Sequence, residues 1–415
     1  MKIKSISHKL ISGSVLSFFL VMFSTNHCFS GEIGVTRDTI KLGYCMAMSG
    51  FLASAGVPIA GGTRLVFQDK NDQGGIYGRK IKLLVEDDQY RPALTVTMTK
   101  KLLYREKIFS LCGYMGASNV LAIAPILKKE KLPIVTVSSS RKLSYPPKRY
   151  IFPFIPPNDF DAYILVDYIM KDLKAKNPRI AVFCMENDMG LGGLRGMREA
   201  LKPYGLKLVA EEMCKPSAVD FTSQIIGLKI KKPDYVVYVG VPRSGASFLA
   251  QCKRLSFSTQ FIGTTTSMDD KLVELAGDAA EGFIGTTSPV LWHSDDPGAV
   301  KYRELLKKYQ PKQIPAFVHI MGYNCAIIVW EGLKRAGRNL TREGFVDALE
   351  TLKDFDAGMV KGVTYGPNER LGARSYLIVK ADVKNKRFIP ITDWRKVTPP
   401  PGSESVKLRS TSGLI

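Results

Sequence analysis

Three consecutive serines are the residues of this chain whose type and position most readily bind a small molecule. Ser138, Ser139 and Ser140 directly follow the apolar run 133–137, which has the length of a buried strand. Hydroxyl groups at the carboxyl end of a parallel strand lie where α/β folds bind their ligands. Serines also cap helices and form turns, so a purely structural role is the alternative.

Histidines are too few for the usual catalytic and metal-binding sets. The chain carries four, and only His293 and His319 lie beyond residue 30. This number argues against a His-based catalytic triad and against a multi-histidine metal site. The chain also lacks the short motifs of serine hydrolases, zinc proteases and phosphate loops.

Two other motifs resemble functional sites but have simpler interpretations. The segment 190–196 is rich in glycine and opens a predicted helix, yet Arg195 stands where the dinucleotide fingerprint needs its third glycine. Glu86, Asp87 and Asp88 follow a strand without further acidic partners, which favours loop and cap contacts over a calcium site. We therefore predict that the protein is not an enzyme and binds no metal or cofactor.

The segment 40–92 predicts the elements that position such residues. Residues 40–46 and 81–85 are short apolar runs of strand length, and 59–71 has helical periodicity. The loop 49–56 then falls at the carboxyl edge of a parallel sheet, where a ligand cleft forms. The glycine-rich segment 71–78 predicts a structural turn away from that edge.

Strands and helices alternate along the rest of the chain in two similar halves. The predicted elements include a helix over 120–131 that Pro125 interrupts, and strands at 180–185, 206–210 and 235–239. This pattern predicts an α/β fold of two doubly wound parallel-sheet lobes joined by a hinge at 156–158. Lobe 1 comprises 31–156 plus about 286–361, and lobe 2 comprises 157–285 plus about 362–395. A flexible basic tail, 396–415, follows.

The N-terminus has the composition of an export signal. Lysines precede the apolar stretch 10–23, which is too short for a comfortable membrane span, and small residues follow it. We predict a signal peptide over 1–30 and a periplasmic protein, with a lipid anchor on Cys28 as the less favoured alternative. Removing three lysines lowers the net charge of +21 to +18, and no nucleic-acid signature accompanies the scattered lysines that remain.

Six cysteines lie beyond the predicted signal. Their spacing matches no zinc or C-x-x-C pattern, and several fall in apolar strands, where a free thiol behaves as a small hydrophobe. An even number in an exported chain also permits disulfides. We favour free core cysteines, and the sequence does not decide any pairing.

With these features, the chain resembles the Leu/Ile/Val-binding family, which comprises type I periplasmic solute-binding proteins of ABC importers. The resemblance covers about residues 40–394, and the glycine turn together with the Ala-Glu-Gly segment makes it specific. Its marks are Met48-Ser49-Gly50 with Ala53 and Gly56, Asn71-x-x-Gly74-Gly75-Ile76-x-Gly78-Arg79-Lys80, Asp87-Asp88, Pro233-Asp234, Gln260-Phe261-Ile262-Gly263 and Gly277-Asp278-Ala279-Ala280-Glu281-Gly282.

The resemblance implies a Venus-flytrap mechanism. A small ligand binds between the lobes, contacts from both lobes stabilise the closed form, and that form docks on an ABC permease in the membrane. The family also implies a set of ligand-binding positions in loops of both lobes. In this chain those positions carry Ser49, Met115, Ala117, Ser118, Ser138, Ser139, Ser140, Met189, Val241, Thr265 and Tyr323.

Several of these positions depart from the amino-acid binders of the family. Ala117 stands where a serine is usual, while Met189 and Val241 replace tyrosines. Thr265 replaces the acidic residue that neutralises the α-ammonium group of an amino acid. A buried ammonium without a carboxylate costs on the order of several kcal/mol.

The departures leave two ligand hypotheses open. One is a small carboxylate or amide without an obligatory α-ammonium, lying against an apolar wall of Met115, Met189 and Val241. The other is an ordinary branched-chain or other amino acid, with Glu186, Asp188 or Asp269 taking over the ammonium.

The leading function is the solute-binding component of an ABC importer, expected to be a monomer. A soluble ligand sensor for a membrane receptor is the alternative, because this fold also serves in receptor ectodomains. The residue types alone do not name the ligand.

Overall fold

The computed structural model describes residues 31–50 and 52–397. The predicted signal peptide, Cys28 and nearly all of the predicted tail lie outside these residues. Within them, no helix is both long and apolar enough to cross a membrane. All six cysteines of this part are buried and unpaired.

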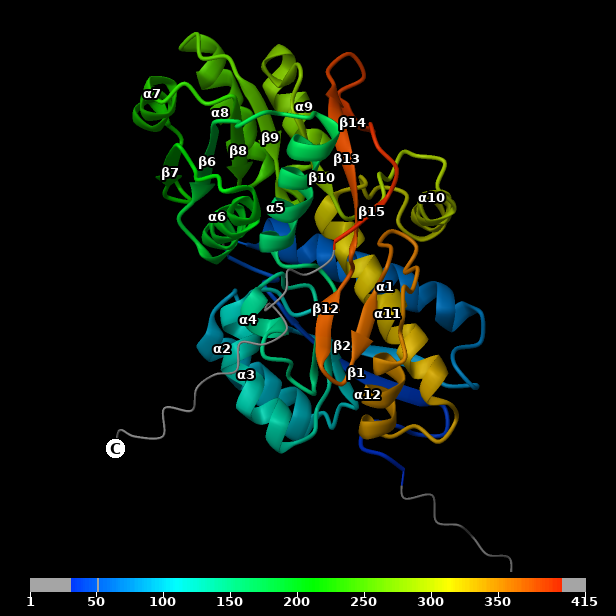
Figure 1. Ribbon diagram of the computed structural model, residues 1–415. Helices are drawn as coiled ribbons and strands as arrows, with labels where there is room; N and C mark the ends of the chain where they lie inside the picture. Colours follow the sequence, from blue (N-terminus) through cyan, green and yellow to red (C-terminus); the bar gives the residue numbers. More distant parts are fainter. Residues whose placement is uncertain (1–30, 51, 398–415) are drawn as a thin grey trace, which may run out of the picture. The chain divides into compact units, whose positions relative to one another are not determined.

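The first lobe, in which Figure 1 labels strands β1 and β2, contains a parallel sheet with the strand order β2-β1-β3-β4-β5. Its strands are β1 (Thr39–Met46), β2 (Lys80–Asp87), β3 (Ser110–Cys112), β4 (Ile134–Thr136) and β5 (Ile151–Pro153). Its helices are α1 (Ala53–Asp72), α2 (Pro92–Lys100) with η1 (Lys101–Arg105), α3 (Ala117–Lys129), α4 (Arg141–Ser144), α10 (Pro297–Tyr309), α11 (Phe317–Ala336) and α12 (Arg342–Glu350).

The second lobe contains a mixed sheet with the order β14-β13-β10-β9-β8-β6-β7. Its strands are β6 (Ile180–Met185), β7 (Ala210–Cys214), β8 (Tyr235–Val239), β9 (Gln260–Gly263), β10 (Ile284–Thr287), β13 (Ser375–Asp382) and β14 (Arg387–Pro390), with β15 (Arg395–Lys396) paired to β13. Its helices are α5 (Asn158–Asp167), η2 (Tyr168–Asp172), α6 (Asp188–Leu201), η3 (Lys202–Tyr204), α7 (Thr222–Ile230), α8 (Pro242–Arg254), η4 (Thr265–Ser267), α9 (Asp270–Ala276) and η5 (Gly277–Ala280).

The central strands are apolar along their whole length because helices cover both faces of each sheet. In β6, Phe183 packs with α7, α8 and α9, whereas its neighbour Val182 packs with α5 and α6. Every residue of β6 is buried. Continuous apolar strands of this kind are typical of doubly wound parallel sheets. The predicted fold class, an α/β protein of two such lobes, is confirmed.

Helix α1 begins earlier than the sequence predicts. Gly56 and Pro58 suggested a loop up to residue 58, but both lie inside α1. A Cβ atom on Gly56 would lie 2.0 Å from the carbonyl oxygen of Ala47, so the glycine lets the helix approach the end of β1. The predicted cleft loop is thereby shortened to the residues before Ala53.

Two other predictions of local structure were wrong. The sequence placed a strand at 206–210, but the strand is β7, Ala210–Cys214, an edge strand with alternating burial. Pro125 was expected to interrupt a helix, yet α3 continues through it. The turn at 71–78 is structural, since the Asn71 amide bonds to both backbone groups of Ile81.

The chain crosses between the lobes three times, near Phe154, Ser288 and Ala373. The first and third crossings touch, because the Ala373 amide donates to the Phe154 carbonyl at 2.8 Å. Before the third crossing, β11 (Thr364–Gly366) and β12 (Glu369–Gly372) lie against α12 and β5 of the first lobe. The lobe boundaries stay a prediction, and these contacts favour lobe 1 for residues 364–372.

Candidate functional site

Two loops of lobe 1 meet at the carboxyl edge of its sheet. β3 and β4 are parallel neighbours, so the loops that follow them lie side by side. The Ser138 hydroxyl donates to the Tyr114 carbonyl oxygen at 3.4 Å and thereby joins the two loops. The structure thus brings Met115, Ala117, Ser118, Ser138, Ser139 and Ser140 to one edge of the lobe.

The three serines of the second loop differ in what their hydroxyl groups do. Ser138 is buried and bonded within the loops, and Ser140 is the N-cap of α4, with its Oγ accepting from the Lys142 amide at 3.4 Å. Ser139 is partly exposed, and within the described residues its hydroxyl has no hydrogen-bond partner. Ser139 is therefore the serine with a free donor.

Two other predicted lobe-1 residues lie apart from this loop pair. The Ser49 hydroxyl donates to Asp87 Oδ2 at 2.5 Å and is exposed. Tyr323 is 3% exposed within α11 and packs edge-on against Tyr302, with ring centroids 5.3 Å apart. The assignment of both residues to a ligand site stays a prediction.

The predicted residues of lobe 2 follow three adjacent parallel strands. Met189 lies in the first turn of α6 after β6, Val241 is the N-cap of α8 after β8, and Thr265 follows β9. Because β6, β8 and β9 are neighbours in the sheet, the three residues share its carboxyl edge. Val241 is 40% exposed, whereas Thr265 is 4% exposed.

Thr265 contacts a buried carboxylate that the sequence analysis did not select. Its backbone amide and its hydroxyl both donate to Asp161 Oδ1, at 2.9 and 2.5 Å. The Thr286 hydroxyl donates to the same oxygen at 2.5 Å. Burial raises the pKa of Asp161 to about 6, although the hydrogen bonds from Thr265 and Thr286 act to lower it.

A small cavity lies beside Thr265 at the crossings between the lobes. Its volume is about 10 Å³, which is close to what a single water molecule needs, and most of its lining is apolar. Thr265 and Ser288 are the exceptions, and the Ser288 hydroxyl is buried without a hydrogen-bond partner in the described part of the chain. The lining residues are Phe154, Ile155, Pro156, Thr265, Ser288, Pro289, Phe317, Met321 and Val360.

Charged side chains join the lobes beside the serine loop. Lys142 of α4 lies 3.1 Å from Asp188 of α6, with both side chains largely exposed. Arg141 reaches Glu199 at 3.0 Å and the buried Asp159 at 3.4 Å. The loop that carries Ser139 is therefore continuous with contacts to lobe 2.

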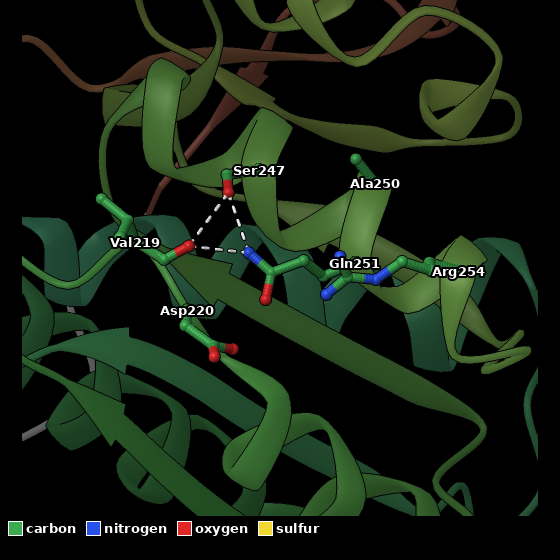
Figure 2. A pocket seen from close by; sticks show the side chains of 6 residues that line it. All are labelled: Val219, Asp220, Ser247, Ala250, Gln251 and Arg254. Atoms are coloured by element: carbon green, nitrogen blue, oxygen red, sulfur yellow. Dashed lines mark hydrogen bonds between the residues drawn. The ribbon is translucent and has the colours of Figure 1, made fainter.

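Two other hollows lack the features of this site. Figure 2 shows one beside α8, where Gln251 bonds to the Val219 carbonyl and to Ser247, so these polar groups satisfy one another. The other, lined by α3 and residues 147–151, is an apolar groove at the amino end of β5. It therefore lies at the opposite edge of the sheet from the serine loop.

The comparison with known proteins agrees with this architecture. A family model described as "Periplasmic binding protein" matches residues 39–387. The chain belongs to the periplasmic binding protein family. It is of the Leu/Ile/Val-binding type, and members of that family are solute-binding proteins rather than enzymes. The family is periplasmic, binds small molecules and works with ABC transporter permeases.

Individual relatives cover most of the chain. The Leu/Ile/Val-binding protein BraC3 of Rhizobium johnstonii is 23% identical over 343 residues, which is 82% of this chain and 91% of the relative. The leucine-specific-binding protein of Salmonella typhimurium is 25% identical over 325 residues, which is 78% and 85% of the two chains.

Two solved structures have a similar fold. A fatty acid ABC transporter substrate-binding protein from Thermomonospora curvata has a TM-score of 0.77 at 26% identity, covering 88% of this chain and 94% of its own. A branched chain amino acid ABC transporter protein from Thermus thermophilus with bound valine has a TM-score of 0.78 at 24% identity, covering 88% and 98%.

Sequence reasoning missed Asp161 and Ser288. Both lie near crossings between the lobes and among other polar residues, since Asn158 and Asp159 precede Asp161, and Thr286 and Thr287 precede Ser288. Asp161 lies in the first turn of α5, where acids are common next to the helix dipole and attract no notice. The apolar residues that follow Asp161 could have indicated that α5 is a buried helix. Eight of the ten residues of α5 are buried, including this acid.

Proposed function

We propose that this periplasmic binding protein is the extracytoplasmic solute-binding component of an ABC importer, and that it binds a small carboxylate or amide between its lobes. The observation that carries the proposal is that the predicted positions of each lobe lie at the carboxyl edge of its sheet, next to crossings where residues of the two lobes pack around a small void. A ligand there contacts both lobes only when they are closed, so its binding energy favours the closed form.

The lobe-1 side of the site suits a carboxylate or amide oxygen. Ser139 follows β4 and supplies a free hydroxyl donor, and α3 begins at Ala117 after the neighbouring strand β3, although neither residue lines the small void at the crossings. Amide groups at a helix N-terminus and hydroxyl donors together stabilise a negatively charged or partially negative oxygen. An α-ammonium group is not required, because Thr265 occupies the place of the acid that would pair with it.

Two of the other acids offered by the sequence have other partners. Asp188 pairs with Lys142. Asp269 caps α9 through the Lys271 amide at 2.9 Å and accepts from the Phe317 amide at 3.1 Å. Glu186 is exposed. Asp188 and Asp269 are therefore poor partners for an α-ammonium group, which favours a ligand that does not require one.

A thermal-shift screen tests the proposed function. The purified chain, without its signal peptide, is heated with amino acids, aromatic acids, fatty acids, amides and urea in turn. We expect a rise in melting temperature with at least one carboxylate or amide. Stabilisation by leucine or valine alone, with no effect of any compound that lacks an α-amine, would establish the alternative of an ordinary amino-acid-binding protein.

The importer role needs a separate experiment. We expect the ligand-loaded protein to stimulate ATP hydrolysis by a reconstituted permease and ATPase encoded beside it, with less effect from the unliganded protein. Binding to a receptor ectodomain without such stimulation would favour the sensor alternative.

A further inference from the structure

We propose that Asp161 fixes the Thr265 hydroxyl as a hydrogen-bond acceptor, so that the ligand must present an N–H donor to lobe 2. This inference rests on the proposed function and specifies its ligand. It makes Asp161 a positioning residue for ligand recognition, and it assigns a selective role to a side chain outside the predicted site.

The Thr265 hydroxyl has a single proton, and Asp161 already accepts it. A hydroxyl group has one proton to donate and lone pairs to accept with. Thr265 donates that proton to Asp161 Oδ1 at 2.5 Å. Towards any third group, Thr265 Oγ1 can then only accept, and the Thr265 amide is also committed to Asp161, at 2.9 Å.

Among the described residues, no positively charged side chain pairs with Asp161. The neighbouring acid Asp159 binds Arg195 through two nitrogens and also contacts Arg141. Asp161, 1% exposed, forms no ion pair within the described residues, and its favourable partners are the groups of Thr265 and Thr286. An anion in this position strengthens hydrogen bonds that a ligand N–H donates to Thr265 and weakens the binding of a ligand carboxylate there.

Thr265 lies where residues of the two lobes meet. Thr265 lines the cavity at the crossings, and the unpartnered Ser288 hydroxyl lines the same cavity. A buried hydroxyl without a partner costs free energy in the unliganded protein, which a polar ligand group can recover. The hydroxyl groups of Thr265 and Ser288 can therefore each accept a hydrogen bond from a ligand N–H group.

The Ser139 donor in lobe 1 and the Thr265 acceptor in lobe 2 together set the orientation of the ligand. Its carbonyl or carboxylate oxygen faces Ser139 in lobe 1, and its N–H group faces Thr265 in lobe 2. Primary amides and amino-bearing acids satisfy both lobes. A simple carboxylate of the same size satisfies lobe 1 alone and meets the charge of Asp161 on the other side.

Matched acid and amide pairs test this orientation in the wild-type protein. The pairs are acetate and acetamide, 4-methylpentanoate and 4-methylpentanamide, benzoate and benzamide, and octanoate and octanamide, with L-leucine added. For whichever size fits, we expect the amide to raise the melting temperature more than the acid does. If the acid stabilises equally or more, the inference is overturned while the proposed function stands. If no compound stabilises the protein, the proposed function fails and the inference fails with it.

Variants then test the two side chains on the best-binding N–H compound. By calorimetry we expect Thr265→Val to weaken binding by about tenfold or more, and Thr265→Ser to restore it, because only serine keeps the hydroxyl. Asp161→Asn should also weaken binding by about tenfold, because it keeps the acceptor oxygen but removes the charge. Unchanged affinity in either Thr265→Val or Asp161→Asn would overturn the inference.

A control on the same helix separates charge at the site from charge in general. Asp167→Asn makes the same chemical change at a partly exposed position of α5, where the carboxylate pairs with Lys171. We expect wild-type affinity in this variant. An equal loss of affinity in Asp167→Asn would show a general electrostatic effect and would contradict a specific role for Asp161.

Discussion

Replacing Asp161 by asparagine should stabilise the fold, and the gain should grow as the pH rises. Burial raises the pKa of this carboxyl group from its ordinary 3.8 to about 6, so the folded protein holds its proton more tightly than the unfolded chain does. Between these two values the unfolded chain binds fewer protons. Wild-type stability therefore falls as pH rises through this window, and it stays lowered above pH 6.

The size of the effect follows from the two pKa values. A difference of about two pKa units, at about 1.4 kcal/mol each, makes ionised Asp161 cost the fold about 3 kcal/mol. The asparagine side chain carries no charge at any pH, while its Oδ1 keeps the three hydrogen bonds from Thr265 and Thr286. The new amide nitrogen needs a partner of its own, which adds a cost that does not depend on pH.

The assay is urea unfolding of the unliganded wild-type protein and Asp161→Asn at pH 4, 5, 6, 7 and 8. The difference in the free energy of unfolding should shift by about 2 kcal/mol in favour of the variant between pH 4 and pH 7, because part of the total of about 3 kcal/mol has already appeared below pH 4. Other titrating groups cancel in this difference, and Asp167→Asn serves as the control. A difference that stays constant from pH 4 to pH 8 would refute the claim that Asp161 is a buried, unpaired charge.

Three further predictions concern the serine loop, the α1–α11 contact and a buried histidine. Ser139→Ala should weaken ligand binding about tenfold in calorimetry without changing the melting temperature of the unliganded protein, and an unchanged affinity would remove Ser139 from the site. Gly62→Ala should lower the free energy of unfolding by about 3 kcal/mol in urea, because its Cβ would lie 2.0 Å from the His319 carbonyl oxygen. The control Gly61→Ala should change stability little, because there the nearest atom is in the His319 ring, at 3.3 Å. Equal effects of the two variants would contradict this packing of α1 against α11. Burial lowers the pKa of His319 from 6.5 to about 4, so this histidine should lower the free energy of unfolding by about 3 kcal/mol as the pH falls from 7 to 4. His319→Gln should lack this loss in urea unfolding. If wild type and variant lose stability in parallel, His319 is not the group responsible.

The regular parts of the fold could be predicted because their residues carry the pattern themselves. The strands β6 and β8 occur at the predicted residues, since a fully apolar run has one stable place in a doubly wound sheet. The start of α1 could not be predicted in the same way. The need for Gly56 comes from its contact with Ala47, which exists only once the helix and β1 have packed.

The edge strand β7 shows a different limit. It alternates exposed and partly buried residues before the buried Cys214 and includes two glutamates, so it lacks the apolar run that marked its neighbours. The strand was predicted at the more apolar segment 206–210 instead, which precedes β7 in the chain. Edge strands need apolar residues on one face only, so their sequences resemble those of loops.

The candidate site was predictable as a set of loops but not as a set of contacts. The carboxyl edges of the strands position Ser139 and Thr265 as expected from the order of the elements. The partner of Thr265 comes from more than 100 positions earlier in the chain, on a helix that follows the first crossing. The resemblance to amino-acid binders drew attention to the acid missing at position 265, whereas the structure places an acid directly behind it.

The most direct test is a crystal structure of the protein with the tightest-binding compound from the acid and amide pairs. We predict that the ligand lies between the lobes, with an oxygen at hydrogen-bond distance from Ser139 and an N–H group at hydrogen-bond distance from Thr265 Oγ1. Asp161 should still accept from Thr265 on the far side. A ligand bound in the groove beside α3, or one in the cleft with no donor near Thr265, would contradict the account.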